Sequence, residues 1–195
     1  MKKKERSVNI PTIEEVENEQ KRLRHRAVYQ RTLRGTIAVL LVVAAISVLV
    51  ATLWMPVLQI YGSSMSPTLE AGQIVVSVKT NQLKTGEVVA FWQGNKLLVK
   101  RVIAGPGQWV DIDMDGNVTV DGKELTEDYL DVKALGNCDV ELPHQVEESR
   151  WFLMGDNRDV SVDSRSVAIG DVSKDQIEGK IVFRIWPLNK TGSIQ

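Results

Sequence analysis

The chain has 195 residues, of which 43% are hydrophobic and 25% are charged, so a largely disordered, collagen-like or disulfide-dense protein is excluded. Its net charge of −1 is unevenly placed: residues 1–34 hold ten Lys and Arg against five Glu (net +5), whereas residues 35–195 hold fourteen against twenty Asp and Glu (net −6). The two ends are therefore expected to meet different surroundings, and the acidic main portion argues against a nucleic-acid partner.

An uncharged apolar run from Gly35 to Met55 predicts a transmembrane helix. Its 21 residues would extend ~31 Å as a helix, which matches the ~30 Å hydrocarbon core of a bilayer. Trp54 suits the membrane interface at the end of the run, and Pro56 discourages continuation. A buried core helix and a cleaved signal peptide are the alternatives. The run is longer than the ~7–15 apolar residues of a signal peptide and begins later, so a signal-anchor is favoured.

Basic residues crowd the N-terminal flank of this run, with no acidic residue between Gln20 and Gly35. The positive-inside rule keeps such a flank in the cytoplasm. We therefore expect a single-pass protein of the cell membrane with three parts: a cytoplasmic basic tail (1–34), a transmembrane signal-anchor helix (35–55) and an extracytoplasmic domain (56–195). The tail is expected to be a short helix or disordered, and no chemistry is assigned to it.

Short apolar runs separated by turn residues follow the anchor and predict a mostly β domain. Asp115-Gly116 and Asp121-Gly122 supply the positive φ that tight hairpins need, and no long helical period appears after the anchor. Residues 134–148 have no steady period and predict a loop. The expected fold is an antiparallel β-sheet or barrel-like domain with strands at 73–79, 87–92, 96–104, 108–113, 117–121, 151–154 and 180–186.

Cysteine and histidine are scarce, which narrows the chemistry. Cys138 is the single cysteine and forms no internal disulfide, and His25 and His144 lack metal-ligand spacing, so neither a metal nor another cofactor is expected. His25 also lies on the cytoplasmic side of the predicted span, and His144 lies in the predicted loop. A serine nucleophile in the outer domain is therefore expected to take its base from a lysine rather than from a histidine.

Three segments of the outer domain carry side chains suited to such chemistry: residues 62–69, Lys100 within an apolar strand, and residues 155–165. Lys100 shares a strand face with Leu98 and Val102, and burial among aliphatic neighbours lowers the pKa of a lysine from its free value of ~10.4. Each segment also has an interpretation without catalysis: a polar turn after the anchor, an exposed edge lysine, and a turn held by Asp–Arg ion pairs.

Four stretches resemble, in the same order, the motifs of the type I signal peptidase family. GSSMSPTL (62–69) resembles S-M-x-P-T, TGEVVAF (85–91) resembles G-[DE]-[IV]-V-x-F, KRVIAGPGQ (100–108) resembles K-R-[IV]-x-x-x-P-G, and GDNRDVSVDSR (155–165) resembles G-D-N-R-x-x-S-x-D-S-R. The resemblance covers residues 60–187 and is greatest to the compact Gram-positive members. It implies a membrane-anchored serine endopeptidase with a Ser/Lys dyad. Such an enzyme removes N-terminal signal peptides from exported preproteins after small residues at positions −3 and −1.

The resemblance also implies roles for individual residues. Ser64 matches the nucleophile, Lys100 matches the general base, and Ser161 matches the serine whose hydroxyl orients that base. The backbone N–H of Ser64 would hold the oxyanion, but Gly62 stands where some members use a serine hydroxyl as the second donor. Five further residues match groups that brace the site, the first two as an ion pair: Asp163, Arg165, Asp156, Asn157 and Arg158.

The substrate is expected to bind as an extended strand added to an exposed sheet edge. Its small residues imply shallow apolar pockets, which we expect among the strands before Ser64 and around residues 97–99. The expected partners are preprotein signal peptides emerging from the secretion pathway and the lipid bilayer, and the protein is expected to be a monomer. The predicted substrate-binding residues are Gly62, Met65, Leu97, Leu98 and Val99.

Three other functions stay open. One is a Ser/Lys peptidase devoted to a single precursor, and another is a non-catalytic, membrane-anchored chaperone or assembly factor with the same fold. The third is a self-cleaving, repressor-like Ser/Lys protein. Retention of both Ser64 and Lys100 argues against the second, and the transmembrane run argues against the third.

Overall fold

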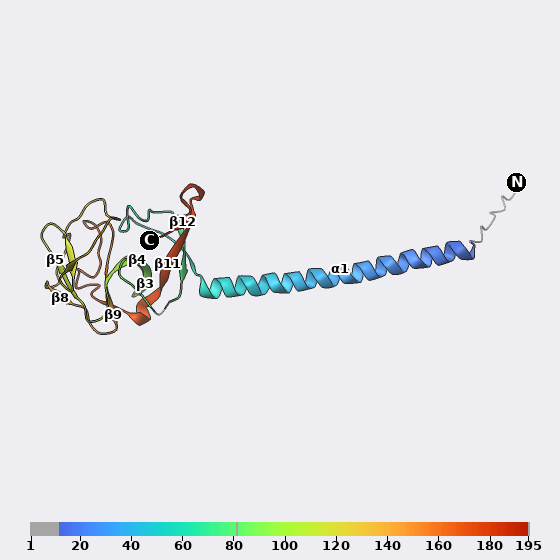
Figure 1. Ribbon diagram of the computed structural model, residues 1–195, viewed down its shortest axis with the longest axis horizontal. Helices are drawn as coiled ribbons and strands as arrows, with labels where there is room; N and C mark the ends of the chain where they lie inside the picture. The colour runs from blue at the N-terminus through green and yellow to red at the C-terminus, as the bar shows by residue number, and fades with distance from the viewer. Residues whose placement is uncertain (1–11, 81, 195) are drawn as a thin grey trace. The chain divides into compact units, whose positions relative to one another are not determined.

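The protein was analysed as a computed structural model, which describes residues 12–80 and 82–194 and, for residues 51–54, the backbone alone. It consists of two compact units, Met1–Val50 and Ala51–Gln195. The first unit is helical and the second is built almost entirely of strands (Figure 1).

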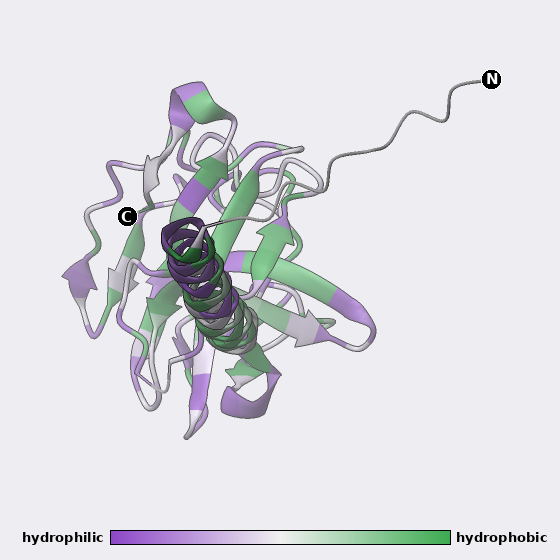
Figure 2. Ribbon diagram, turned by 90° about the vertical axis from the view of Figure 1, so that its right-hand side faces the viewer, coloured by the Kyte–Doolittle hydropathy of each residue, from purple (hydrophilic) through white to green (hydrophobic). Residues whose placement is uncertain are grey.

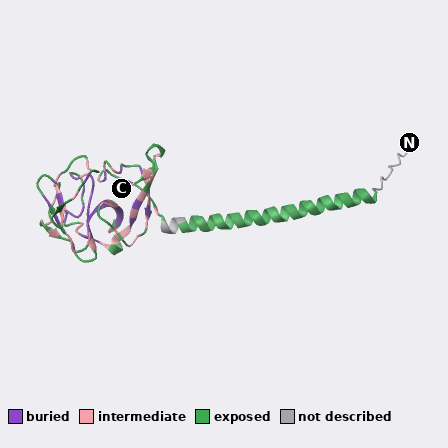
Figure 3. Ribbon diagram, in the orientation of Figure 1, coloured by how far each residue is buried: buried purple, intermediate pink, exposed green. Residues whose placement is uncertain are grey.

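One long helix, α1 (Ile13–Trp54), contains most of the predicted anchor. A capping box begins it: the Thr12 N–H donates to Glu15 Oε2 at 2.9 Å, and the Glu15 N–H donates to Thr12 Oγ1 at 3.4 Å. Its described side chains are exposed, and the segment Ile13–Val50 is long and apolar enough to cross a membrane (Figure 3). Figure 2 shows that α1 is hydrophilic in one part and hydrophobic in the other.

The structure extends the predicted anchor at its N-terminal end. Residues 13–34 were expected to form a separate short helix or to be disordered, but they continue into the anchor without a break at Gly35. The capping box at Thr12 and the many strong helix formers between residues 13 and 34 explain this continuity. The first eleven residues of the predicted tail lie outside the described residues.

The larger sheet has eight strands, and every pairing in it is antiparallel. Its order is β1-β2-β11-β3-β4-β9-β10, with β12 paired to β11. The strands are β1 (Val57–Gln59), β2 (Ile74–Val78), β3 (Val88–Gln93), β4 (Lys96–Ala104), β9 (Arg150–Met154), β10 (Val172–Ser173), β11 (Ile177–Trp186) and β12 (Gly192–Ser193). Two short 3₁₀ helices, η1 (Lys174–Gln176) and η2 (Leu188–Lys190), flank β11.

The smaller sheet has the antiparallel order β7-β6-β5-β8. Its strands are β5 (Trp109–Ile112), β6 (Val118–Val120), β7 (Lys123–Glu124) and β8 (His144–Gln145). Asp121 and Gly122 form a two-residue turn between β6 and β7 with φ values of 52° and 74°, so the predicted tight hairpin is confirmed there. In the other Asp-Gly pair, only Gly116 has a positive φ among the described residues.

The mostly antiparallel β fold predicted from the sequence is confirmed, and each of the seven predicted strands overlaps an observed one. Residues 144–145 correct the predicted loop, because they pair with β5 as β8. Strands β1, β7, β10 and β12 were not predicted, since two or three residues are too few to show an alternating pattern.

A hydrophobic cluster holds the segment that follows β1 against the larger sheet. Met65 and Leu69 are 2% and 0% exposed, and they pack with residues that include Val75, Val88 and Ile181 from β2, β3 and β11. Burial of each such side chain contributes about 1.5–3 kcal/mol. The turn that carries Ser64 is thereby held on both sides, because Ile60 before it and Met65 after it belong to this cluster.

Candidate active site

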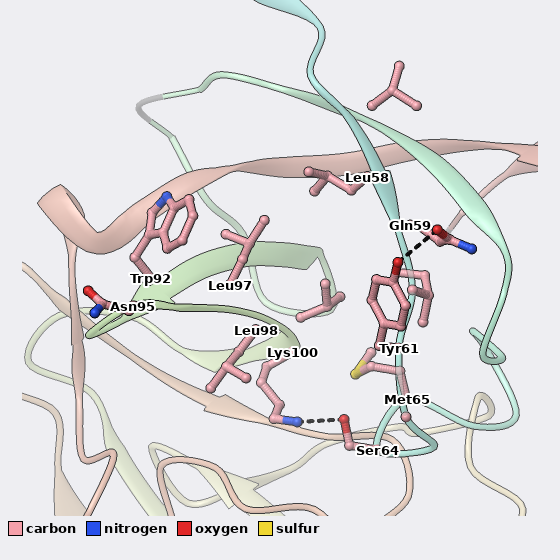
Figure 4. A pocket seen from close by; sticks show the side chains of 14 residues that line it. Leu58, Gln59, Tyr61, Ser64, Met65, Trp92, Asn95, Leu97, Leu98 and Lys100 are labelled. Carbon is pink, nitrogen blue, oxygen red and sulfur yellow. Dashed lines mark hydrogen bonds between the residues drawn. The ribbon is translucent and has the colours of Figure 1, made fainter.

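The side chains of Ser64 and Lys100 meet at one end of a groove in the larger sheet (Figure 4). Ser64 lies in the turn that follows β1, and Lys100 lies in the middle of β4. The Lys100 ammonium donates a hydrogen bond of 2.7 Å to Ser64 Oγ. The two predicted catalytic residues, 36 positions apart in the chain, are therefore in direct contact.

Lys100 is buried, with 3% of its surface exposed. Burial penalises the charged ammonium and is the main reason why the pKa of Lys100 falls to about 8. The carboxylate of Asp163 acts in the opposite direction and raises this pKa, whereas the Arg165 guanidinium lowers it further. The alternative of an exposed edge lysine is therefore wrong, and a large fraction of this amine is neutral at mildly alkaline pH.

The backbone of the 155–165 loop packs directly against Ser64. The Asn157 N–H donates a hydrogen bond of 3.1 Å to the Ser64 carbonyl oxygen. A Cβ atom added to Gly155 would lie 2.5 Å from the same oxygen and closer still to Ser161 Oγ, so only glycine fits there without displacement. Asn157 thus reaches the site through its main chain.

Asp163 and Arg165 form the predicted ion pair, and both are fully buried. Arg165 Nε donates to Asp163 Oδ1 at 2.9 Å, and Arg165 Nη2 donates to Asp163 Oδ2 at 2.9 Å. Burial alone would raise the pKa of Asp163, but its hydrogen bonds and charge attraction with Arg165 outweigh burial and leave it lowered. Asp163 Oδ2 also accepts a hydrogen bond from the Gly155 N–H at 2.9 Å, which holds the loop closed.

Asp156 braces β4 from the far side. It accepts two hydrogen bonds from Arg101, from Nε to Oδ1 at 2.9 Å and from Nη2 to Oδ2 at 2.7 Å. The Arg101 guanidinium also lies over the Tyr129 ring, 3.8 Å from its centroid. Because Arg101 follows Lys100 in the same strand, this contact fixes the backbone that carries the lysine.

Arg158 and Ser161 do not line the groove. Arg158 forms a buried ion pair with Glu127 and donates from Nε to the Gly155 carbonyl at 3.1 Å, so it supports the loop. Ser161 is 2% exposed, and its Oγ has no hydrogen-bond partner among the described residues. The predicted contact between this hydroxyl and the Lys100 amine is therefore not formed in this structure.

The groove that ends at Ser64 has a volume of about 570 Å³. All five predicted substrate-binding residues line it, and the residues of β1 lie among its walls, as expected for strands before Ser64. Sequence reasoning missed Trp92 and Asn95, which lie at its far end (Figure 4). The full lining is Val57, Leu58, Gln59, Ile60, Tyr61, Gly62, Ser64, Met65, Trp92, Asn95, Leu97, Leu98, Val99 and Lys100.

Supporting partners from outside the four motifs were also missed. Glu127, the partner of Arg158, and Tyr129, beneath Arg101, lie between β7 and β8, far from either arginine in sequence. A local pattern gives no signal for such pairs. Only the structure shows that Arg101 and Arg158 are buried, and a buried charge needs a partner.

Residues 33–186 match the family model described as signal peptidase, peptidase S26. The chain belongs to this family. It is 38% identical over 152 residues to signal peptidase IB from Staphylococcus aureus (strain COL), a match that covers 67% of this chain and 78% of that protein. It is also 32% identical over 169 residues to signal peptidase I from Bacillus licheniformis, covering 78% and 88% of the two chains.

The structure is similar to that of a signal peptidase I from Enterococcus faecalis V583, with 25% sequence identity, a TM-score of 0.43, and coverage of 52% of this chain and 98% of the other. Membership in the S26 family makes the chain a peptidase, a hydrolase of peptide bonds. The apolar helix α1 agrees with membrane anchoring.

Proposed function

We propose that this peptidase removes N-terminal signal peptides from exported preproteins, with Ser64 as the nucleophile and Lys100 as the general base. The observation that carries the proposal is the 2.7 Å contact between Ser64 Oγ and the buried Lys100 amine. A serine hydroxyl needs an adjacent base, and a lysine serves as one when burial lowers its pKa towards the working pH. Both conditions are met here.

The reaction is an acyl transfer in two steps. Neutral Lys100 accepts the Ser64 hydroxyl proton as Ser64 Oγ bonds to the scissile carbonyl carbon. The Lys100 ammonium then donates this proton to the leaving amine as the peptide bond breaks. A water molecule, deprotonated by the same lysine, then bonds to the carbonyl carbon of the acyl-enzyme ester. The bond from this carbon to Ser64 Oγ breaks, the Lys100 ammonium returns the proton to Ser64 Oγ, and the signal peptide leaves with a free carboxyl end.

The oxyanion of each step would be held by the backbone N–H of Ser64. Among the described residues this N–H donates to no acceptor, so it is available to a substrate. Gly62, two residues before the nucleophile, has no side chain to add a second donor, and its φ of 80° is one that glycine adopts freely. A water molecule or a neighbouring hydroxyl is the expected second donor.

Two free strand edges support binding of an extended substrate in the groove. Among the described residues, β1 pairs only with β2, and the Lys96–Lys100 part of β4 pairs only with β3, because β9 joins β4 from Arg101 onward. Both segments line the groove. A peptide strand placed between them gains main-chain hydrogen bonds from unpaired edges.

The same geometry supports a preference for small residues at positions −3 and −1. Side chains of an extended peptide alternate between faces, so the residues at −3 and −1 point to the same wall. The groove wall near Ser64 includes the buried side chains of Ile60 and Met65. Large substrate side chains would collide with this packed wall, whereas Ala or Gly fits against it.

The anchor supports an extracytoplasmic position for the peptidase unit. Six basic residues flank the N-terminal side of the apolar run, at Lys21, Arg22, Arg24, Arg26, Arg31 and Arg34. The positive-inside rule assigns this flank to the cytoplasm, and thus the chain after Pro56 to the outside of the cell membrane. Ser64 follows Met55 by nine residues, which span ~30 Å at most. The proposed nucleophile is thereby kept near the surface where a signal peptide leaves the bilayer. The proposed active form is a monomer.

The test is cleavage of a preprotein by the full-length chain in detergent micelles, followed by N-terminal sequencing of the product. Ser64→Ala and Lys100→Ala are each expected to abolish cleavage while the fold is retained. Ser193→Ala is the control, because Ser193 is an exposed serine of β12 that does not line the groove, and it is expected to leave cleavage unchanged. Normal processing by either of the first two variants would reject the dyad, and absence of cleavage by the unaltered chain would favour a non-catalytic role.

A further inference from the structure

The groove continues beyond the part that positions −1 and −3 would occupy. Trp92 and Asn95 line its far end, and Figure 4 shows the Trp92 and Leu97 side chains well separated from Ser64 and Lys100 along it. A volume of about 570 Å³ is more than two small side chains fill, and it falls within the range of pockets that enclose whole ligands. The far end is therefore available to substrate residues further from the scissile bond.

Trp92 is exposed and yet firmly held. It is 43% exposed, although its indole Nε1–H donates a hydrogen bond of 2.9 Å to Glu178 Oε2 on β11. Its backbone carbonyl accepts a second hydrogen bond from Gln176 Nε2 at 3.1 Å. A large aromatic ring fixed in this way binds a partner at low entropic cost, because its rotamer is already set.

The hairpin between β3 and β4 sets the distance of Trp92 from the nucleophile. Gly94, with a φ of 56°, and Asn95 form a two-residue turn, and the resulting register pairs Trp92 with Leu97. Leu97 precedes Lys100 by three residues, or ~10 Å along a strand, and Asn95 precedes it by five residues, or ~17 Å. A substrate strand that follows β4 and has its scissile bond at Ser64 therefore brings its residues −4 to −6 to Trp92 and Asn95.

We propose that Trp92, together with Leu97 and Asn95, forms a further substrate subsite that takes an apolar side chain at one of positions −4 to −6. This inference rests on the proposed function and deepens it. The apolar stretch of a signal peptide lies on the N-terminal side of the scissile bond, so its last residue falls within reach of this subsite. Contact with Trp92 thus makes the rate of cleavage depend on the number of residues between the apolar stretch and the scissile bond.

The experiment measures kcat and KM of the full-length chain for paired peptides that differ only in having Leu or Ser at position −4, −5 or −6. The unaltered chain is expected to prefer Leu about tenfold in kcat/KM at one of these positions, mainly through a lower KM. In Trp92→Ala this preference is expected to disappear, and in Trp92→Phe it is expected to be intermediate. Trp109→Ala is the matched control, because Trp109 is similarly exposed at 48%, lies in β5 and does not line the groove.

Each outcome decides the inference. Equal cleavage of Leu and Ser peptides by the unaltered chain at all three positions would overturn the subsite, as would a Leu preference that Trp92→Ala retains. Residual cleavage of the Ser peptides by Trp92→Ala shows that this variant is folded. If Trp92→Ala does not fold, the Leu preference of Trp92→Phe decides: a preference as large as that of the unaltered chain would overturn the subsite. If the unaltered chain cleaves none of the peptides, the proposed function itself fails, and the inference fails with it.

Discussion

The backbone N–H of Asn157 and the carbonyl oxygen of Ser64 are joined by a hydrogen bond of 3.1 Å. This bond couples the 155–165 loop, with its buried Asp163–Arg165 pair, to the residue that carries the proposed nucleophilic hydroxyl. Two segments about 90 residues apart in sequence thus form one rigid unit. The position of Ser64 Oγ depends on how closely they approach.

Gly155→Ala is expected to lower kcat strongly with a smaller effect on KM. The added methyl group would lie 2.5 Å from the Ser64 carbonyl oxygen and would push the two segments apart. A displacement of ~1 Å at a reacting group costs on the order of 100-fold in rate. Steady-state kinetics with a signal-peptide substrate measures the effect. Gly192→Ala is the control, since nothing lies within 4 Å of its added methyl group, and equal rates for both variants would contradict the prediction.

The rate is expected to rise with pH and to level off above about pH 8. Under the proposed function Lys100 acts in its neutral form, and its pKa is lowered to about 8, so below that value kcat/KM is expected to fall about tenfold per pH unit. Lys100→Arg is expected to be inactive at every pH, because arginine stays charged. Lys96→Arg, at the exposed start of the same strand, serves as the control. A profile that is flat between pH 6 and 9 would exclude Lys100 as the base.

Lys100→Met is expected to stabilise the fold at pH 7. The folded-state pKa of about 8 lies below the unfolded value of 10.5, so the unfolded chain binds more protons between these values and stability rises with pH there. Below pH 8 the full penalty for burying the charge applies, about 3 kcal/mol at 1.36 kcal/mol per pKa unit. Thermal unfolding of the full chain in detergent at pH 7 and pH 10 measures the gain, which should shrink at the higher pH. A gain independent of pH would indicate better packing instead.

Arg101→Met is expected to destabilise the protein by roughly 3–5 kcal/mol, because it leaves the buried Asp156 carboxylate without its charged partner. Lys190→Met provides the comparison: it removes an exposed ion pair with Glu70 of similar length, 2.8 Å, and is expected to change stability by at most ~1 kcal/mol. Denaturant unfolding of both variants tests the difference. Similar losses for the two would show that burial of the Arg101 pair is energetically unimportant.

The longer strands and the proposed Ser64–Lys100 pair could be predicted from the sequence because their signals are local. Strand β4 has the predicted bounds of 96–104, since its nine residues are rich in Leu, Val and Ile and lie between the turn residues at Gly94 and Gly105. Ser64 and Lys100 each lie within a short motif, and Lys100 has aliphatic neighbours on its own strand face. These neighbours made burial of the lysine one of two open interpretations, and the structure decides between them, with Lys100 3% exposed.

The rest of the site depends on contacts between distant segments. The pairing of Arg158 with Glu127 and the stacking of Arg101 on Tyr129 need the tertiary fold. Trp92 reaches the groove because the two-residue hairpin at Gly94 and Asn95 pairs it with Leu97, and the groove itself forms only when β4 and the distant strand β1 come together. The predicted contact of Ser161 with the Lys100 amine depends on the orientation of the serine hydroxyl. The motif places Ser161 in the loop but does not predict the direction of its Oγ.

Among the described residues, β1 and the first half of β4 each have one unpaired backbone edge, and under the proposed function these edges also limit which polypeptides can be cut. These groups bind a chain only by exchanging hydrogen bonds with its main chain, and a helix has already used its own internally. A substrate that is helical or folded across the scissile bond would therefore not bind, whatever its side chains. Under the proposed function, the sheet selects for unstructured linkers, and mature domains that have begun to fold are protected from internal cleavage.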